Sequence, residues 1–187
     1  MPPMPPVTQA LLLINVGMFC AQYLLNLQAL ALWPIDRGFL PWQIVTYSVL
    51  HADMFQLFFN SLGLWMFGAE LERVWGGKRF TQFWLASVVT GAFTQLALSA
   101  ALGWGNPTVG ASGGLFGLLL AFGMMFPNQV IMPLFPPIPM KAKVFVVVFG
   151  ALALVLGLMA RSAHLGGMIG AFLMIQYWRG RPPFGRR

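Results

Sequence analysis

The sequence predicts an all-α polytopic membrane protein, built as a bundle of six transmembrane helices. Of its 187 residues, 58% are hydrophobic and only 8% are charged, and the mean hydropathy is +0.75, far from the composition of a soluble domain. Several apolar runs are long enough to cross a bilayer, for which a helix needs about 20 residues. The basic residues lie in the gaps between these runs, so the net charge of +7 predicts contact with anionic lipid headgroups and argues against nucleic acid as a partner.

Six apolar segments can be drawn along the chain, which we interpret as a single transmembrane domain over residues 1–187. We expect spanning helices over 7–27, 54–71, 80–102, 112–126 and 144–160, and a sixth from a tight turn at 161–162 to Trp178.

The first segment carries three polar residues at spacings of seven and four, on one helix face that would contact other helices and not lipid: Asn15, Gln22 and Asn26. The loop that follows, residues 28–53, is long and only moderately polar. Its aromatic residues suit the headgroup level, so we expect this loop and these side chains in the interface: Trp33, Trp42 and Tyr47.

The second segment again places polar or small residues on one face, at spacings of four and three: Gln56, Asn60 and Gly63. A charged turn is expected over 72–79, with an ion-pair cluster of Glu70, Glu72 and Arg73. The third segment carries small residues suited to close helix packing: Ser87, Thr90, Gly91 and Thr94.

The fourth segment is short. At 1.5 Å per residue, 112–126 spans roughly 22 Å, against a hydrocarbon core of about 30 Å. One end must therefore stop inside the membrane, shielded by other helices. Nine of the eleven Lys and Arg residues fall on one side of the predicted bundle, which places both termini in the cytoplasm and the start of this segment toward the outer side, below the surface.

The stretch Gly110-Ala111-Ser112-Gly113-Gly114 opens this fourth segment. Small neighbours clear space around the Ser112 hydroxyl, and a helix that starts there directs free N–H groups toward whatever approaches it. An acyl-transfer nucleophile needs both features. For this stretch alone, the alternative interpretation is favoured: a helix-packing glycine motif with a capping serine.

His164 is the one strong candidate for an ionisable residue inside a span, and such residues are functional candidates. Gly167 follows it on the same helix face, and Gly113 and Gly117 line a matching face of the fourth segment. Two glycine-lined faces allow close backbone approach, which could bring the Ser112 hydroxyl within hydrogen-bond reach of His164. Phe116, one turn after Ser112, could pack on the imidazole.

Asn60 and Gln56 supply side-chain amides that could stabilise an oxyanion, although hydrogen bonding between helices is the alternative, above all for Gln56. His51, at the outer end of the second segment, either contributes to the site or is an interfacial histidine. No aspartate lies within a span, so the site would be a Ser-His dyad, and a paired-aspartate protease is excluded. The sequence has neither a metal-ligand motif nor a phosphate-binding loop, and we expect no metal and no cofactor.

At these residues the chain resembles the rhomboid family of intramembrane serine proteases. The matching motifs are G-A-S-G at 110–113, A-H-L-G-G at 163–167 and H-A-D-M-F-Q-L-F-F-N at 51–60, in the family's order on the same segments. The resemblance implies Ser112 as nucleophile, His164 as general base, and Asn60 with the Ser112 amide as oxyanion stabiliser. It also implies an aromatic role for Phe116, a family histidine at His51, and Gly110 and Ala111 as neighbours within the oxyanion or substrate site.

Two positions depart from the family pattern. Gln56 stands where many bacterial members have a second histidine near the oxyanion hole, and glutamine can still donate a hydrogen bond there. Trp42-Gln43 stands where many members have Trp-Arg, which removes any ionic anchoring of the first loop.

The sequence therefore predicts an intramembrane serine endopeptidase that cleaves transmembrane protein substrates in or near their spans. We place it in the bacterial cytoplasmic membrane, among membrane lipids, with its site toward the outer side; its oligomeric state is not predicted. The alternative is a catalytically silent rhomboid-like protein that binds transmembrane clients, against which both Ser112 and His164 argue. A small channel or transporter is disfavoured by the lack of charged residues within spans.

Overall fold

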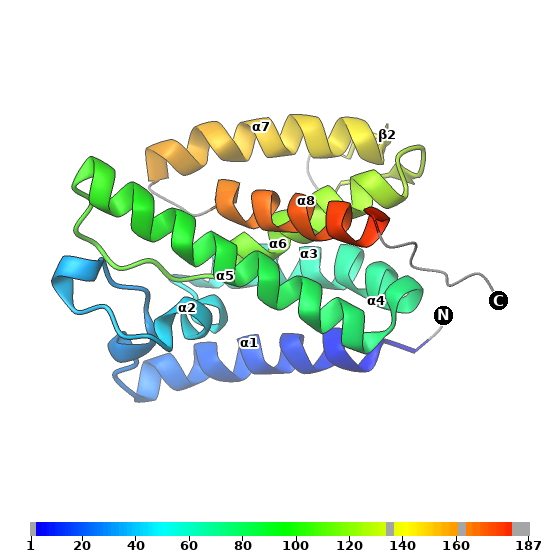
Figure 1. Ribbon diagram of the computed structural model, residues 1–187. Helices are drawn as coiled ribbons and strands as arrows, with labels where there is room; N and C mark the ends of the chain where they lie inside the picture. Colours follow the sequence, from blue (N-terminus) through cyan, green and yellow to red (C-terminus); the bar gives the residue numbers. More distant parts are fainter. Residues whose placement is uncertain (1–2, 134–136, 161–163, 181–187) are drawn as a thin grey trace.

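A computed structural model describes residues 3–133, 137–160 and 164–180, which form a helical bundle (Figure 1). The all-α prediction is confirmed, and each of the six predicted apolar segments coincides with helix. Among the described residues, two helices are long and apolar enough to cross a membrane, α1 (Pro6–Leu24) and α5 (Gly77–Leu102). The remaining long helices are α6 (Ser112–Met125), α7 (Ala142–Ala160) and α8 (His164–Gly180).

The second segment forms one continuous helical path with a π-helical interruption. It consists of α3 (Met54–Gly63), the π-helical stretch η4 (Leu64–Gly68) and α4 (Ala69–Trp75). The Asp53 side chain caps its start by accepting from the Gln56 N–H at 2.7 Å. The predicted turn over 72–79 is wrong in extent, because Gly76, at φ +76°, reverses the chain within one residue and α5 begins directly after it.

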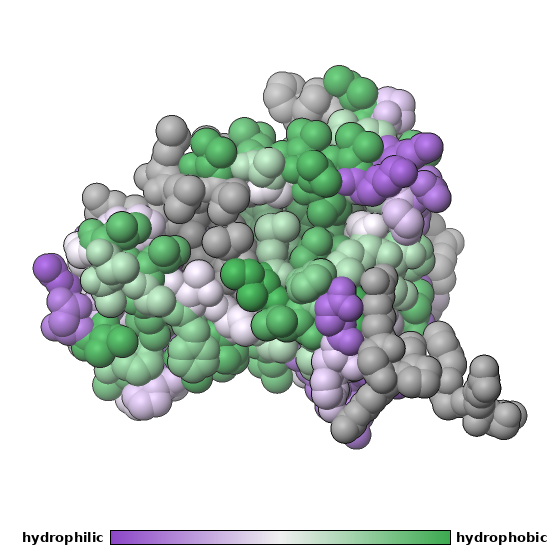
Figure 2. All heavy atoms as spheres, turned by 45° about the horizontal axis from the view of Figure 1, so that its top comes forward, coloured by the Kyte–Doolittle hydropathy of each residue, from purple (hydrophilic) through white to green (hydrophobic). Residues whose placement is uncertain are grey.

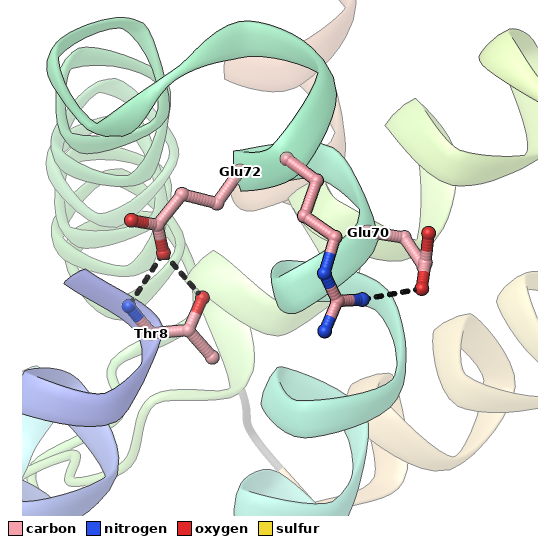
Figure 3. Close-up of polar contacts among 4 residues, drawn as sticks. Thr8, Glu70 and Glu72 are labelled. Carbon is pink, nitrogen blue, oxygen red and sulfur yellow. Dashed lines mark hydrogen bonds and ion pairs between the residues drawn. The ribbon is translucent and has the colours of Figure 1, made fainter. Parts of the chain in front are cut away.

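Glu72 fastens α4 to the start of α1 (Figure 3). Its carboxylate accepts from the backbone N–H of Val7 at 3.0 Å and of Thr8 at 2.7 Å, and from the Thr8 hydroxyl at 2.7 Å. The first N–H groups of a helix have no acceptor of their own, and a carboxylate there also interacts favourably with the helix dipole. The predicted three-residue ion-pair cluster is therefore wrong for Glu72, whereas Glu70 and Arg73 do pair.

The long loop between α1 and α3 contains four short helical elements: η1 (Gln28–Leu30), η2 (Ile35–Arg37), α2 (Gln43–Thr46) and η3 (Tyr47–Val49). Gln43, which is fully buried, holds the loop without a charge. Its Oε1 accepts from the Trp33 N–H at 3.1 Å, and its Nε2 donates to the Ala29 carbonyl at 3.2 Å. A neutral amide thus anchors the loop at position 43, the position where Trp-Arg in the family pattern has its arginine.

The centre of the bundle is formed by α5, α6 and α8, whose mutual contacts are the most extensive in the structure. Figure 1 shows α6 and α8 between α1 at one edge and α7 at the other. Large apolar side chains that are fully buried fill this centre, among them Phe80, Phe83, Val88 and Leu118.

The proline-rich connection between α6 and α7 begins and ends in a small antiparallel ladder. Strand β1 (Val130–Ile131) pairs with β2 (Met140–Lys141), with Val130 opposite Lys141. Two further backbone hydrogen bonds, Ala142 N–H to Gln129 and Lys143 N–H to Pro127, close the connection at the start of α7.

The surface of the bundle is largely apolar. In Figure 2, apolar side chains cover most of the visible face, and hydrophilic side chains gather in small groups toward its ends. Large hydrophobic side chains are exposed on α1, α3 and α7, among them Leu13, Tyr23, Phe55 and Val147. In water such a surface would be an aggregation liability, whereas in a membrane it contacts lipid.

Candidate active site

Ser112 is the first residue of α6, at the end of a tightly held turn. Gly110, at φ +124°, donates its N–H to the Tyr47 carbonyl at 2.9 Å. The first helical hydrogen bond runs from the Leu115 N–H to the Ala111 carbonyl at 2.9 Å. The N–H groups of residues 112–114 therefore have no acceptor within the helix, and they lie beside the half-buried Ser112.

The capping-serine alternative does not fit this arrangement. Ala111 occupies the N-cap of α6, where no side chain caps the helix, so Ser112 lies one position too late for that role. The other half of the alternative is correct, because the glycines that surround Ser112 do pack helices together.

Those glycines join α6 to α8 and α5. A Cβ added to Gly167 would collide with the Gly113 carbonyl, so the α8 backbone lies directly against the first turn of α6. A Cβ on Gly117 would lie 2.5 Å from the Ser87 hydroxyl and 3.2 Å from the Gly167 carbonyl. Gly113 directly follows Ser112, and Gly167 lies three residues after His164. The first turns of the two helices that carry the predicted dyad are therefore side by side.

His164 is the first residue of α8, and its side chain lies outside what the structure describes. Phe116 sits one turn into α6, partly buried against the core. The predicted contact between these two side chains stays a prediction.

The helix α3 presents its polar face to the turn that carries Ser112. The Gln56 Nε2 donates to the Val109 carbonyl at 3.4 Å, and a Cβ on Gly110 would lie 2.6 Å from that nitrogen. Two turns further along α3, Gly63 lies against Leu115 of α6. Asn60 is on the same helix face, between these two contacts.

Asn60 is 5% exposed, and its Nδ2 has no hydrogen-bond partner within the described part of the chain. A buried donor without an acceptor is costly and calls for an explanation. Gln56, in contrast, is fully engaged, because its Oε1 also accepts from the Ala52 N–H at 2.7 Å. Among the described residues, no three His, Cys, Asp or Glu side chains come together as metal ligands.

Comparison with known proteins fits this arrangement. A family model described as the rhomboid domain matches residues 39–181, which is most of the chain and includes all the motifs above. The chain belongs to the rhomboid family.

Two curated relatives of this rhomboid, among those it resembles, carry protease names. It is 32% identical over 131 residues to the protein named rhomboid protease GluP from Bacillus subtilis, a match that covers 70% of this chain and 25% of that protein. It is 33% identical to the mitochondrial rhomboid protein 1 of Saccharomyces cerevisiae, over 66% of this chain and 38% of the relative. The protein named putative rhomboid protease YdcA of Bacillus subtilis is 30% identical, over 71% of this chain and 65% of that protein.

The chain thus matches less than two thirds of the length of each of these relatives. At the level of the family, the matches support an integral membrane protein.

In this rhomboid, His51 lies next to α1, near the turn that precedes Ser112. The Gln22 side chain of α1 makes two hydrogen bonds to the His51 backbone. Its Nε2 donates to the His51 carbonyl at 2.9 Å, and its Oε1 accepts from the His51 N–H at 3.0 Å. The ring is fully buried and, as far as the structure describes, neither nitrogen is hydrogen-bonded. Burial lowers the pKa of His51 to about 4, while the nearby Val49 carbonyl and Asp53 act in the opposite direction. His51 also lines a cavity of about 350 Å³, together with Asn26 and Val109.

Tyr47 is a residue of this rhomboid whose position the sequence mispredicts. We expected it in the membrane interface with Trp33 and Trp42, yet it is 1% exposed and its hydroxyl donates to the Val88 carbonyl of α5 at 2.8 Å. Trp42 is 51% exposed, as an interfacial residue would be. No local signal separates the two, because the partner of Tyr47 lies 41 residues away.

Proposed function

We propose that this rhomboid is a serine endopeptidase that cleaves within or near the transmembrane segments of other membrane proteins. The observation that carries the proposal is the contact of Gly167 with Gly113, because it sets the first turns of α8 and α6 against each other. A hydroxyl and an imidazole on those two turns can then act as nucleophile and general base. In this proposal Ser112 attacks the scissile carbonyl and His164 takes its proton, later delivering it to the leaving amine.

The negative charge that develops on the substrate oxygen needs donors that are already in position. The N–H groups at the start of α6 are free of helical acceptors, and the Asn60 Nδ2 is a buried donor without a partner in the described structure. Both features are costly in a resting protein, and both are explained if they bind an oxyanion. Gln56 then acts by supporting the turn at Val109 and Gly110, with its Nε2 still beside the site.

The location follows from the charge distribution. In the topology predicted from the sequence, nine of the eleven Lys and Arg residues fall in the connections and tail opposite the start of the fourth segment. From this charge bias we infer that both termini are cytoplasmic and that the site lies toward the outer side. We propose a bacterial cytoplasmic membrane as the location, where substrates would be other transmembrane proteins. The proposed chemistry needs neither a metal nor an organic cofactor.

Labelling with a fluorophosphonate tests the proposal. The purified protein in lipid should be labelled at Ser112, and Ser112→Ala and His164→Ala should abolish the reaction, whereas Ser99→Ala, which changes a buried serine of α5, should not. Absence of labelling in the wild type would favour the alternative, a silent protein that binds transmembrane clients.

A further inference from the structure

Tyr47 contacts the turn that carries Ser112 through its main chain. Its carbonyl accepts from the Gly110 N–H at 2.9 Å. Gly110 has φ +124°, a conformation that other residues rarely adopt, so this bond holds the turn at the point where the chain changes direction into α6.

The side chain of Tyr47 contacts the other side of the same turn. The hydroxyl donates to the Val88 carbonyl of α5 at 2.8 Å, in a fully buried position. A Cβ added to Gly91 would lie 2.9 Å from this hydroxyl, and one added to Gly113 would lie 3.2 Å from it. The hydroxyl is therefore wedged between α5 and the first turn of α6, in a space that exists because both positions are glycine.

We propose that Tyr47 is a positioning residue for Ser112, an inference that rests on the proposed protease function. Ser112 lies between Gly110, which the Tyr47 carbonyl holds, and Gly113, which the Tyr47 hydroxyl abuts. One residue thus fixes the nucleophile turn from both sides and ties it to α5. Fixing this geometry matters because a displacement of about 1 Å at a reacting atom can lower the rate on the order of 100-fold.

Gly91 lies opposite the Tyr47 hydroxyl, so the contact can be tested with substitutions at both positions. The Tyr47 hydroxyl is the nearest group to a Cβ on Gly91, and the next atoms, in Gly113 and Gly167, are at 3.6 and 3.7 Å, which is ordinary contact. Gly91→Ala should therefore displace the hydroxyl and little else, and removing the hydroxyl should make room for the new methyl group.

The experiment measures the rate of fluorophosphonate labelling for Tyr47→Phe, Gly91→Ala and the double variant at a temperature well below unfolding. Tyr23→Phe, on an exposed tyrosine of α1, removes the same hydroxyl elsewhere and serves as the matched control. We expect Tyr47→Phe to lower the rate constant on the order of tenfold with unchanged affinity for the probe, and Tyr23→Phe to have no effect. Gly91→Ala should cost less in the Tyr47→Phe background than alone.

A purely structural role would lower the thermal midpoint of Tyr47→Phe and leave its labelling rate at low temperature unchanged, which would overturn the inference. Additive effects of Tyr47→Phe and Gly91→Ala would overturn it as well. Hydrogen exchange of the 108–114 backbone gives a readout that does not depend on activity. If the wild type is not labelled, the protease proposal fails, and faster exchange of 108–114 in Tyr47→Phe than in Tyr23→Phe still decides whether Tyr47 holds the turn.

Discussion

The two ends of the bundle are held by different kinds of contact. At the end with Glu72, a buried carboxylate has three hydrogen-bond donors from α1, and the local polar groups are satisfied. At the end with Ser112, the elements are held together by the Gln56 amide, the Tyr47 hydroxyl and closely packed glycines. This second end also retains polar groups without partners in the described structure, the Asn60 Nδ2 and both nitrogens of His51.

The difference separates stability from chemistry. A fully satisfied network fixes two helices and leaves nothing free to bind a substrate. Free donors cost stability, and they can interact with a charge that appears only in a transition state. Changes at the Glu72 end should therefore alter stability with little effect on catalysis, and changes at the Ser112 end should alter catalysis even where the fold persists.

The largest effect is expected at the contact between α6 and α8. Gly167→Ala places a methyl group against the Gly113 carbonyl, a backbone atom that cannot move aside, and should destabilise the protein by about 3 kcal/mol or more while removing activity. Gly17→Ala on α1, where nothing lies within 4 Å, is the matched control and should not destabilise the protein, because Ala is favoured over Gly inside a helix. Thermal midpoints in detergent measure both, and equal midpoints for the two variants would contradict the close contact.

Asn60→Ala should separate catalysis from stability most clearly. The Nδ2 has no partner to lose within the described residues, so the fold should persist, while turnover falls about 100- to 1,000-fold as when an oxyanion donor is removed. Steady-state cleavage of a transmembrane substrate measures the effect, and it should appear in kcat and not in KM. Unchanged turnover would remove Asn60 from the proposed site.

Glu72→Gln should give the opposite result. Loss of charged hydrogen bonds to the start of α1 should cost about 1.5 to 3 kcal/mol, with labelling of Ser112 at low temperature unchanged. Glu70→Gln breaks a more exposed ion pair and should cost less than about 1 kcal/mol. A Glu72 variant that folds normally and loses reactivity would show that the two ends are not independent.

His51 gives the most specific prediction, a dependence of stability on pH. Its folded pKa of about 4 lies below the unfolded value of about 6.5, so between these values the unfolded chain binds more protons. Stability should therefore be fully present above about pH 6.5 and fall as the pH drops toward 4. Thermal midpoints of His51→Asn should depend less on pH in this window than those of the wild type, and equal dependence would assign the effect to other groups.

The sequence predicts the helices well because hydropathy over about 20 residues is a strong signal, and it predicts the glycine-lined approach of α6 and α8 because each face can be read from its own spacing. The partners of Glu72, Gln43 and Tyr47 could not be predicted in this way. The hydrogen-bond partner of Glu72 lies 64 residues away along the chain, and that of the Tyr47 hydroxyl lies 41 residues away. Only the packed bundle therefore reveals these contacts. A charged residue near a turn and a tyrosine in an aromatic-rich loop have common local explanations, and in both cases tertiary packing overrides them.

Cross-linking tests most directly whether residues 112 and 164 face each other. The test variant combines Ser112→Cys and His164→Cys in a Cys20→Ala background, which removes the single natural cysteine. It is treated with a short bifunctional methanethiosulfonate, and its intact mass is measured by mass spectrometry. The control pair combines Ser112→Cys with Gln176→Cys, an exposed position three turns further along α8. We predict a bridged product for the 112–164 pair alone, and two separate adducts on the 112–164 pair would contradict the proposed dyad.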